Sequence, residues 1–168
     1  SHSHEHTAFI SVGANLRDKM GNCRFGIARL TELDGIADVV TSPFYRTAPV
    51  DYLDQDWFVN AAVRFQTTLD PLELLEHIAV IQKQAGRQGD KIRFGPRRLD
   101  LDIIFFGQRV IQTPRLEIPH PRMHKRRFVL QPICDIDPQF RHPLLGCSVR
   151  DLLENLQDDQ QEVVRIDA

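Results

Sequence analysis

The segment GPRRLDLDIIFFG, residues 95–107, places two aspartates in an otherwise apolar strand, directly after a pair of arginines. Side chains alternate along a strand, so Asp100 and Asp102 are expected to share one face. Two carboxylates that close repel each other, and either the neighbouring arginines or a bound cation must compensate their charge. Beyond Asp102 the strand is apolar on both faces, which predicts a central position in its sheet.

Strands and helices alternate around this segment. The strands are predicted at residues 8–12, 38–47, 57–67 and 99–106. Apolar residues at helical spacing predict a first helix, with Met20, Cys23, Ile27, Leu30 and Leu33 on its inner face. A second helix opens with the capping sequence Asp70-Pro71-Leu72-Glu73 and ends at Gly86, with an inner stripe of Leu72, Leu75, Ile78, Ala79 and Gln82. Further helices are expected near 124–131 and after Ser148.

The order strand, helix, strand, strand, helix, strand is that of the α+β, ferredoxin-like split-βαβ sandwich. It predicts a mainly antiparallel sheet with the helices on one face and a C-terminal elaboration. Residues 1–6, which hold three histidines, are expected to be a disordered leader or an expression remnant, and residues 7–168 to form a single domain.

Composition narrows the class of protein. The chain has 168 residues, 42% of them hydrophobic and 26% charged, which is typical of a soluble globular protein without a membrane span. Cys23, Cys134 and Cys147 are odd in number and form no CxxC pair, so neither a disulfide framework nor a zinc site is expected. We therefore expect a cytoplasmic protein.

The net charge of −2 hides two basic clusters that flank the aspartate strand. They contain Arg87, Lys91, Arg93, Arg97 and Arg98 on one side, and Arg115, Arg122, Lys125, Arg126 and Arg127 on the other. Paired carboxylates suit Mg²⁺, which takes its remaining ligands from water and substrate phosphates, and arginines bind phosphate bidentately. Because the familiar glycine-rich phosphate loops are absent, the pattern indicates a triphosphate bound through metal and side-chain arginines.

Structural interpretations of the same residues stay open at this point. Arg97 and Arg98 could simply neutralise the two aspartates in a solvated salt-bridge cluster. His120 and His124 lack a third and fourth metal ligand at suitable spacing, so His120 is either a polar contact to a nucleotide or a loop or capping histidine. Phe58 and Phe128 are core aromatics by default, although a flat heterocycle could stack between them.

The segments RFGPRRLDLDIIFFG (93–107) and IPHPRMHKRRFVLQP (118–132) resemble the 6-hydroxymethyl-7,8-dihydropterin pyrophosphokinase family of folate biosynthesis. SVGANL (11–16), SPFYRTAPV (42–50), WFVNAAV (57–63) and the dipeptide at 86–87 extend the similarity in the same order. The resemblance implies a cytoplasmic, ATP-binding, magnesium-dependent transferase of the kinase type, which moves a diphosphoryl group from ATP to the pterin and releases AMP.

Residue roles are carried over by position from this resemblance. Asp100 and Asp102 would hold two Mg²⁺ ions and, with Arg87 and Arg97, form the catalytic set. The ATP-binding residues would be Gln82, Arg87, Arg93, Arg97, Ile103, Arg115, His120 and Arg126. The pterin would meet Thr47, Val50, Phe58, Asn60 and Phe128, with the carboxamide of Asn60 at the ring edge and the two phenylalanines on the ring faces.

Two alternatives to the transferase come from other classes of function. A ferredoxin-like sheet with basic loops and exposed aromatics can bind RNA, although a nucleic-acid backbone would meet Asp100 and Asp102 there. A metal-dependent phosphohydrolase could use the same acids. We expect ATP and the hydroxymethyl dihydropterin as the small-molecule partners of a monomer, without nucleic acid or membrane.

Overall fold

The computed structural model describes residues 5–49, 53–86, 98–157 and 161–167. Its main strands are β1 (His6–Ala14), β2 (Ile36–Thr41), β3 (Tyr45–Thr47), β4 (Phe58–Thr67), β5 (Asp100–Phe106) and β8 (Val163–Arg165). A separate hairpin consists of β6 (Ile111–Gln112) and β7 (Glu117–Ile118). The helices are α1 (Lys19–Thr31), α2 (Pro71–Gln84), a 3₁₀ turn η1 (Met123–Lys125), α3 (Arg127–Ile136) and α4 (Val149–Glu154). The expected leader falls largely on residues outside these ranges, and His6 instead begins β1, with its ring 5.1 Å from that of Phe106.

The central sheet has the split-βαβ topology that the element order predicted. Its strands follow the order β5-β1-β4-β3-β8, and β2 pairs with β4 beside β3. The described pairings within it are antiparallel, and β4 lies between β1 and β2, the two strands that α1 connects. The α+β, ferredoxin-like prediction is therefore confirmed.

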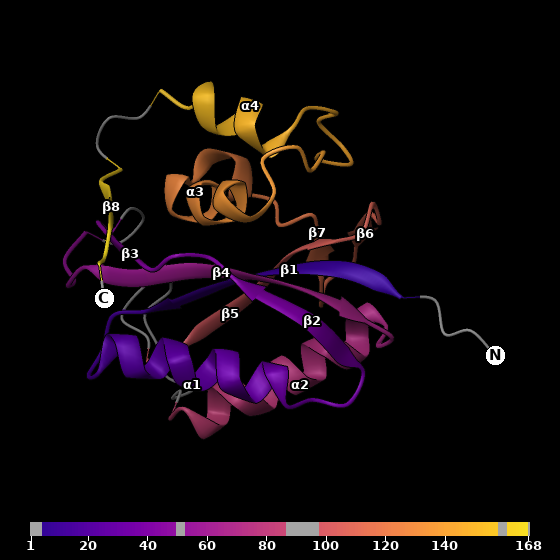
Figure 1. Ribbon diagram of the computed structural model, residues 1–168, viewed down its shortest axis with the longest axis horizontal. Coiled ribbons are helices and arrows are strands. Elements are labelled where there is room, and N and C mark those ends of the chain that lie inside the picture. The colour runs from indigo at the N-terminus through magenta and orange to yellow at the C-terminus, as the bar shows by residue number, and fades with distance from the viewer. Residues whose placement is uncertain (1–4, 50–52, 87–97, 158–160, 168) are drawn as a thin grey trace.

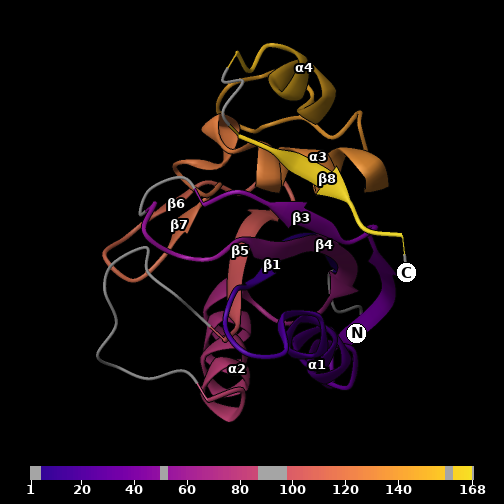
Figure 2. The ribbon, with the colours of Figure 1, turned by 90° about the vertical axis from the view of Figure 1, so that its left-hand side faces the viewer.

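The helices cover both faces of the sheet, which corrects the expectation that they lie on one. In Figures 1 and 2, α1 and α2 pack below the sheet, and α3 and α4 form a layer above it. The C-terminal elaboration thus adds a third layer, because the face opposite α1 and α2 also carries apolar side chains that need cover.

A β-bulge in β5 explains how this strand serves both faces. Phe9 of β1 pairs with Phe105, but Ile10 pairs with Ile103, so Ile104 is the extra residue. Ile103 packs into the core under α1 and α2, whereas Ile104 and Phe105 both pack into the core under α3. The strand is apolar on both sides because helices cover both sides, and the prediction of a central strand is wrong, since β5 ends the strand order.

The predicted strand 38–47 is divided at Pro43 into β2 and β3, which both pair with β4. The Ser42 hydroxyl accepts a hydrogen bond from the Ala62 N–H at 2.8 Å. It thereby gives this β4 N–H a partner where β2 and β3 are separated. The short strand β8, which pairs with β3, was missed because three residues carry too little periodicity. None of the helices in the described residues is long and apolar enough to span a bilayer.

Two helix details depart from the pattern expected from sequence. The inner face of α2 consists of Pro71, Leu74, Ile78, Ile81 and Gln82, whereas Leu72 is 46% exposed. Gly26, which the predicted inner face of the first helix did not include, is buried where α1 meets the sheet. A Cβ at Gly26 would lie 2.9 Å from the Leu99 Cδ2 atom, so this glycine permits the close approach of α1 to β5.

The cap of α2 yields a test of the fold. Asp70 accepts a hydrogen bond from the Glu73 N–H, and the Glu73 carboxylate accepts one from the Asp70 N–H, both at 2.9 Å. We expect Asp70→Ala to lower the free energy of unfolding by about 1 kcal/mol, because the first turn loses its cap. Urea denaturation measures the change, and Asp70→Asn, which retains an accepting oxygen, should stay close to the wild type. Equal losses in both variants would contradict the capping role.

Candidate active site

Three of the predicted site residues, Asn60, Asp100 and Asp102, share the face of the sheet that α3 covers. Gly13 of β1 pairs with Asn60 of β4 on one side and with Asp100 of β5 on the other. Ser11, two residues earlier, pairs in the same way with Ala62 and Asp102. Since directly paired residues point to the same face, one face of the sheet carries both the carboxylate pair and the Asn60 amide. The predicted shared face of Asp100 and Asp102 agrees with this register.

Asn60 is held at the floor of this face. Its side chain is buried, and its Nδ2 donates to the hydroxyl of Thr47, also buried, at 2.6 Å. Thr47 pairs with Phe58 in the β3–β4 ladder, so these three residues lie side by side. A Cβ on Gly13 would stand 2.5 Å from the Asn60 Oδ1 atom. Gly13 therefore lies against a predicted site residue, a contact that the sequence analysis did not identify, although a strand glycine can mark close approach.

The carboxylate pair lies where β5 begins. Asp100 is half-buried and Asp102 is exposed, while Leu101 between them is buried on the opposite face. The Gln82 side chain reaches from α2, and its Oε1 accepts a hydrogen bond from the Leu101 N–H at 2.9 Å. This contact, which the sequence analysis did not anticipate, satisfies an N–H of the sheet edge between the two aspartates.

The donor chemistry of the pair fits Mg²⁺. Both side chains offer carboxylate oxygens on one face, and hard cations prefer oxygen ligands. Among the residues that the structure describes, no group of three or more histidine, cysteine or acidic side chains is placed to hold a metal. A cation at Asp100 and Asp102 would therefore take further ligands from water or from a bound phosphate.

The arginines predicted beside the pair are only partly described. Arg87, Arg93, Arg97 and Val50 lie outside the described residues. The Arg98 guanidinium lies against Gly86 at the end of α2, where a Cβ would be 2.5 Å from its Nη1 atom. A cation at this position also suits the negative end of the helix dipole.

Three further residues were assigned to the nucleotide by resemblance, namely Ile103 within β5, and Arg115 and Arg126 after it. Arg115 is exposed on the turn between β6 and β7, and Ile103 is buried in the α1–α2 core. Arg126 is half-buried directly before α3, with its Cζ 5.5 Å from the centroid of the Phe128 ring.

His120 is joined to β5 by its backbone N–H, which donates to the Ile104 carbonyl at 3.1 Å. Its Nδ1 accepts a hydrogen bond from the Arg122 N–H at 3.2 Å, which leaves Nε2 as the protonated nitrogen of the neutral ring. Burial, with the nearby charges of Arg126 and Arg122, lowers the pKa of His120 to about 4. At neutral pH the ring is uncharged and Nε2 is a hydrogen-bond donor.

Helix α3 carries Phe128 over the sheet and is fastened at both ends. The Tyr45 hydroxyl of β3 donates to the Asp135 carboxylate, and burial together with this bond raises the pKa of Tyr45 to about 12. Near the start of α3, the Gln161 Oε1 accepts from the Arg127 N–H at 2.7 Å, and its Nε2 donates to the Lys125 carbonyl at 2.9 Å. Phe58 and Phe128 are both half-buried and so are not sealed inside the core.

Comparisons with a family model and with individual known proteins agree with one another. The model of the family described as 7,8-dihydro-6-hydroxymethylpterin-pyrophosphokinase (HPPK) matches residues 9–138. The chain is 41% identical over 132 residues to the 2-amino-4-hydroxy-6-hydroxymethyldihydropteridine pyrophosphokinase of Bacillus subtilis, which covers 79% of this chain and 78% of that protein. It is 46% identical over 134 residues to the mitochondrial folate synthesis bifunctional protein of Arabidopsis thaliana, covering 80% of this chain.

Some of these relatives are much longer than this chain, which spans 24% of the length of the Arabidopsis protein. Among solved structures, an HPPK-DHPS protein of Plasmodium falciparum matches 95% of this chain and 49% of its own chain, with a TM-score of 0.72. At 16% sequence identity, that likeness supports the fold.

The lowered pKa of His120 predicts acid sensitivity. Between pH 6.5, the ordinary histidine value, and about 4, the unfolded chain binds a proton that the folded protein does not, so stability falls as the pH falls through this window. We expect His120→Gln to reduce this loss, by up to about 3 kcal/mol if the full shift is realised. Urea midpoints at pH 7.5 and 4.5 measure it, and the exposed His77→Gln serves as control. Parallel pH profiles for all three proteins would contradict the assignment.

Proposed function

The chain belongs to the 7,8-dihydro-6-hydroxymethylpterin-pyrophosphokinase family, and from this premise we propose that it transfers the pyrophosphoryl group of ATP to 6-hydroxymethyl-7,8-dihydropterin in folate biosynthesis. Family membership favours this transferase over the RNA-binding and phosphohydrolase alternatives. The chain covers most of the Bacillus subtilis enzyme, whose name states this activity. The finer assignments below come from the family resemblance, and the register of the sheet supports those of Asn60, Asp100 and Asp102.

The observation that carries the proposal is the position of Gly13 between Asn60 and Asp100. Neighbouring strands are about 4.8 Å apart, so Asn60 and Asp100 are separated by about 10 Å on one face. A flat pterin whose edge is bound by the Asn60 amide would therefore direct its opposite end toward the carboxylates. This arrangement would bring the hydroxymethyl group to the place where the triphosphate is bound.

Pterin binding would use the polar floor and the two aromatic side chains. The Asn60 carboxamide can donate and accept, as the ring edge requires, and its bond to Thr47 orients it. Phe58 and Phe128, on β4 and α3, would stack on the two ring faces, and the backbone of Thr47 and Val50 would complete the edge. The bonds of Tyr45 and Gln161 would hold α3 and Phe128 in place.

ATP binding would use the acid pair and the basic residues. Asp100 and Asp102 would hold two Mg²⁺ ions, and the bound ions would neutralise charge on the triphosphate and on the entering and leaving oxygens. Arg87 and Arg97 would clamp phosphate oxygens, while Arg93, Arg115, Arg126, Gln82 and the Nε2–H of His120 would contact the nucleotide. Ile103, whose side chain is buried in the α1–α2 core, would contribute only its backbone. Gln82 would also fix the carboxylate pair through the Leu101 N–H.

In the proposed reaction, the hydroxymethyl oxygen attacks the β-phosphorus of ATP. The bond between this phosphorus and the bridging oxygen of the α-phosphate breaks, and AMP leaves with that oxygen. The hydroxyl proton passes to solvent. The protein contributes chiefly by positioning the two substrates and by supplying positive charge, as in other phosphoryl transfers.

We further propose that the chain acts as a monomer in a reducing compartment such as the cytoplasm. The proposed site draws on residues of one chain, and Cys23, Cys134 and Cys147 are free thiols. The name of the Arabidopsis relative, in contrast, places that protein in mitochondria.

Removing one carboxylate tests the metal role. We expect Asp102→Ala to lower turnover by about a thousandfold or more, because the Mg²⁺ ions that would bind the triphosphate lose a carboxylate ligand. The assay incubates the protein with MgATP and the hydroxymethyl dihydropterin and measures AMP by chromatography, with the exposed Asp34→Asn as control. Full activity in the Asp102 variant would remove that residue from the metal site, and AMP formed without the pterin would favour a phosphohydrolase.

Gly13→Ala tests the close approach of β1 to Asn60. The added Cβ would displace the Asn60 amide, because it would lie only 2.5 Å from the Asn60 Oδ1 atom. We expect the KM for the pterin to rise about tenfold and the KM for ATP to change little, at an overpacking cost of roughly 1–3 kcal/mol in stability. Steady-state kinetics, with each substrate varied in turn, gives the two KM values. A melting curve shows beforehand that the variant is folded. A pterin KM equal to that of the wild type would refute the assignment of Asn60.

A further inference from the structure

Lys19 is an unusual first residue for a helix. It begins α1, directly after the N-cap Asp18, where a positive charge opposes the helix dipole. Its side chain is only 11% exposed, although a lysine at a helix start can easily extend into water. The electrostatic and desolvation costs of this position imply that the ammonium group has partners elsewhere in the fold.

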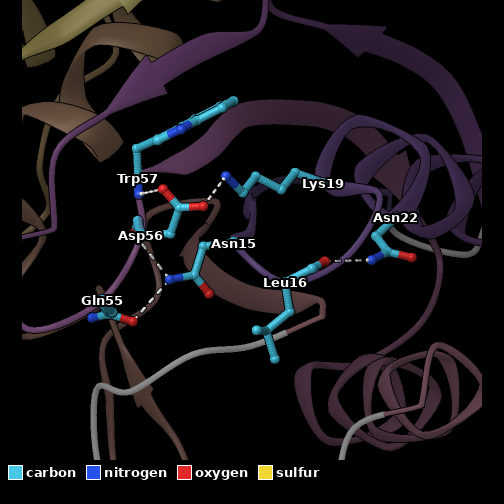
Figure 3. A network of polar contacts seen from close by, with 7 residues as sticks. All are labelled: Asn15, Leu16, Lys19, Asn22, Gln55, Asp56 and Trp57. Carbon is cyan, nitrogen blue, oxygen red and sulfur yellow. Dashed lines mark hydrogen bonds and ion pairs between the residues drawn. The ribbon is translucent and has the colours of Figure 1, made fainter.

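Those partners lie in the segment that leads into β4. The Lys19 Nζ is 2.7 Å from the Asp56 Oδ2 and 3.4 Å from the centroid of the Trp57 ring (Figure 3). The other Asp56 oxygen, Oδ1, accepts from the Trp57 N–H at 2.9 Å. The Arg46 guanidinium of β3 lies 5.0 Å from the same ring, so two cations contact it. We call Lys19, Arg46, Asp56 and Trp57 the Trp57 clasp.

Neighbouring bonds hold the same segment to the end of β1. The Asn15 Nδ2 donates to the Gln55 Oε1 at 2.8 Å and to the Asp56 carbonyl at 3.2 Å (Figure 3). Asn15 follows Ala14, the last residue of β1, and so lies two residues after Gly13. The clasp and Asn15 therefore join the segment before β4 to the strand that carries Gly13.

The clasp acts on one face of the sheet and the proposed pterin site lies on the other. Trp57 packs against the core under α1 and α2. The next residue, Phe58, starts β4 and pairs with Thr47. Because successive residues of an extended chain point to opposite faces, fixing the Trp57 ring against α1 also fixes the direction of Phe58 toward the α3 face. Freeing the Trp57 ring would let the first residues of β4 fray.

We propose that Lys19 is a positioning residue for the pterin, acting through Trp57 on Phe58 and Asn60. The inference rests on the proposed function and extends it, since Lys19 itself need not touch either substrate. Both of its contacts are electrostatic, one to a carboxylate and one to an aromatic face, and each is strengthened by the low exposure of the ammonium group. The hydrogen bond from Lys19, the bond from the Trp57 N–H and the charges of Lys19 and Arg46 also lower the pKa of Asp56, in keeping with a formed cluster.

The test measures pterin binding in Lys19→Met, which removes the charge and retains an unbranched apolar side chain. Trp57 is the only tryptophan of the chain, so its fluorescence reports the clasp directly, and calorimetric titration with 6-hydroxymethyl-7,8-dihydropterin gives the Kd. We expect Lys19→Met to shift the Trp57 emission and to weaken pterin binding by about tenfold, with the KM for ATP and kcat changed less than about twofold. Lys19→Arg, which restores a cation over the ring, should recover most of the affinity.

Arg24→Met is the matched control. Arg24 is an exposed cation on the same helix with its Cζ 5.8 Å from the Phe44 ring, and its removal should leave pterin affinity unchanged. A folded Lys19→Met protein that binds pterin as tightly as the wild type overturns the inference, as does an equal loss of pterin and ATP affinity. Failure of the proposed function would appear instead in the wild type, as the absence of pterin-dependent AMP.

Discussion

The pairing of β1 with β4 and β5 is the constraint on which the site depends. Gly13 sits between Asn60 and Asp100, so the amide and the carboxylate share one face at a separation of two strands. A shift of one residue in either pairing would turn one of these side chains to the opposite core. The buried apolar residues that alternate along β1 and β4 prevent such a shift, because it would expose them to water or bury polar groups.

Contacts around Asn60, Gly13 and Asp100 hold the neighbouring elements β5, α3 and β4 in place. Gln82 satisfies the edge of β5 beside the carboxylates, and the bulge at Ile104 restores apolar contacts with α3 beyond them. Tyr45 and Gln161 fasten α3, and the Trp57 clasp fastens the start of β4. Apart from Gln82, which is also proposed to contact the nucleotide, these residues lie outside the proposed substrate-binding set, whose members must leave room for two ligands.

Several elements were predictable because their signals are local. The capping box at Asp70, the N-cap at Ser148 and the alternation along 57–67 each depend on residues a few positions apart. The shared face of Asp100 and Asp102 follows from strand periodicity alone. In the predicted inner stripe of α2, Ile78 and Gln82 are confirmed, but Leu74 is buried where Leu72 was expected, because both leucines are apolar and only the position of the sheet decides between them.

By itself, the sequence determined the split-βαβ order, the acidic pair and, through a family motif, the family to which the proposed chemistry belongs. Tertiary structure alone decided that helices cover both faces, that β5 is an edge strand, that Gly13 lies against the Asn60 amide, that Gln82 bonds the Leu101 N–H, and that Lys19 lies over the Trp57 ring. The reason is physical. Alternation and capping are encoded within a few residues, whereas a Cβ clash, a side chain at a sheet edge and a cation over a distant ring exist only once separate segments have packed together.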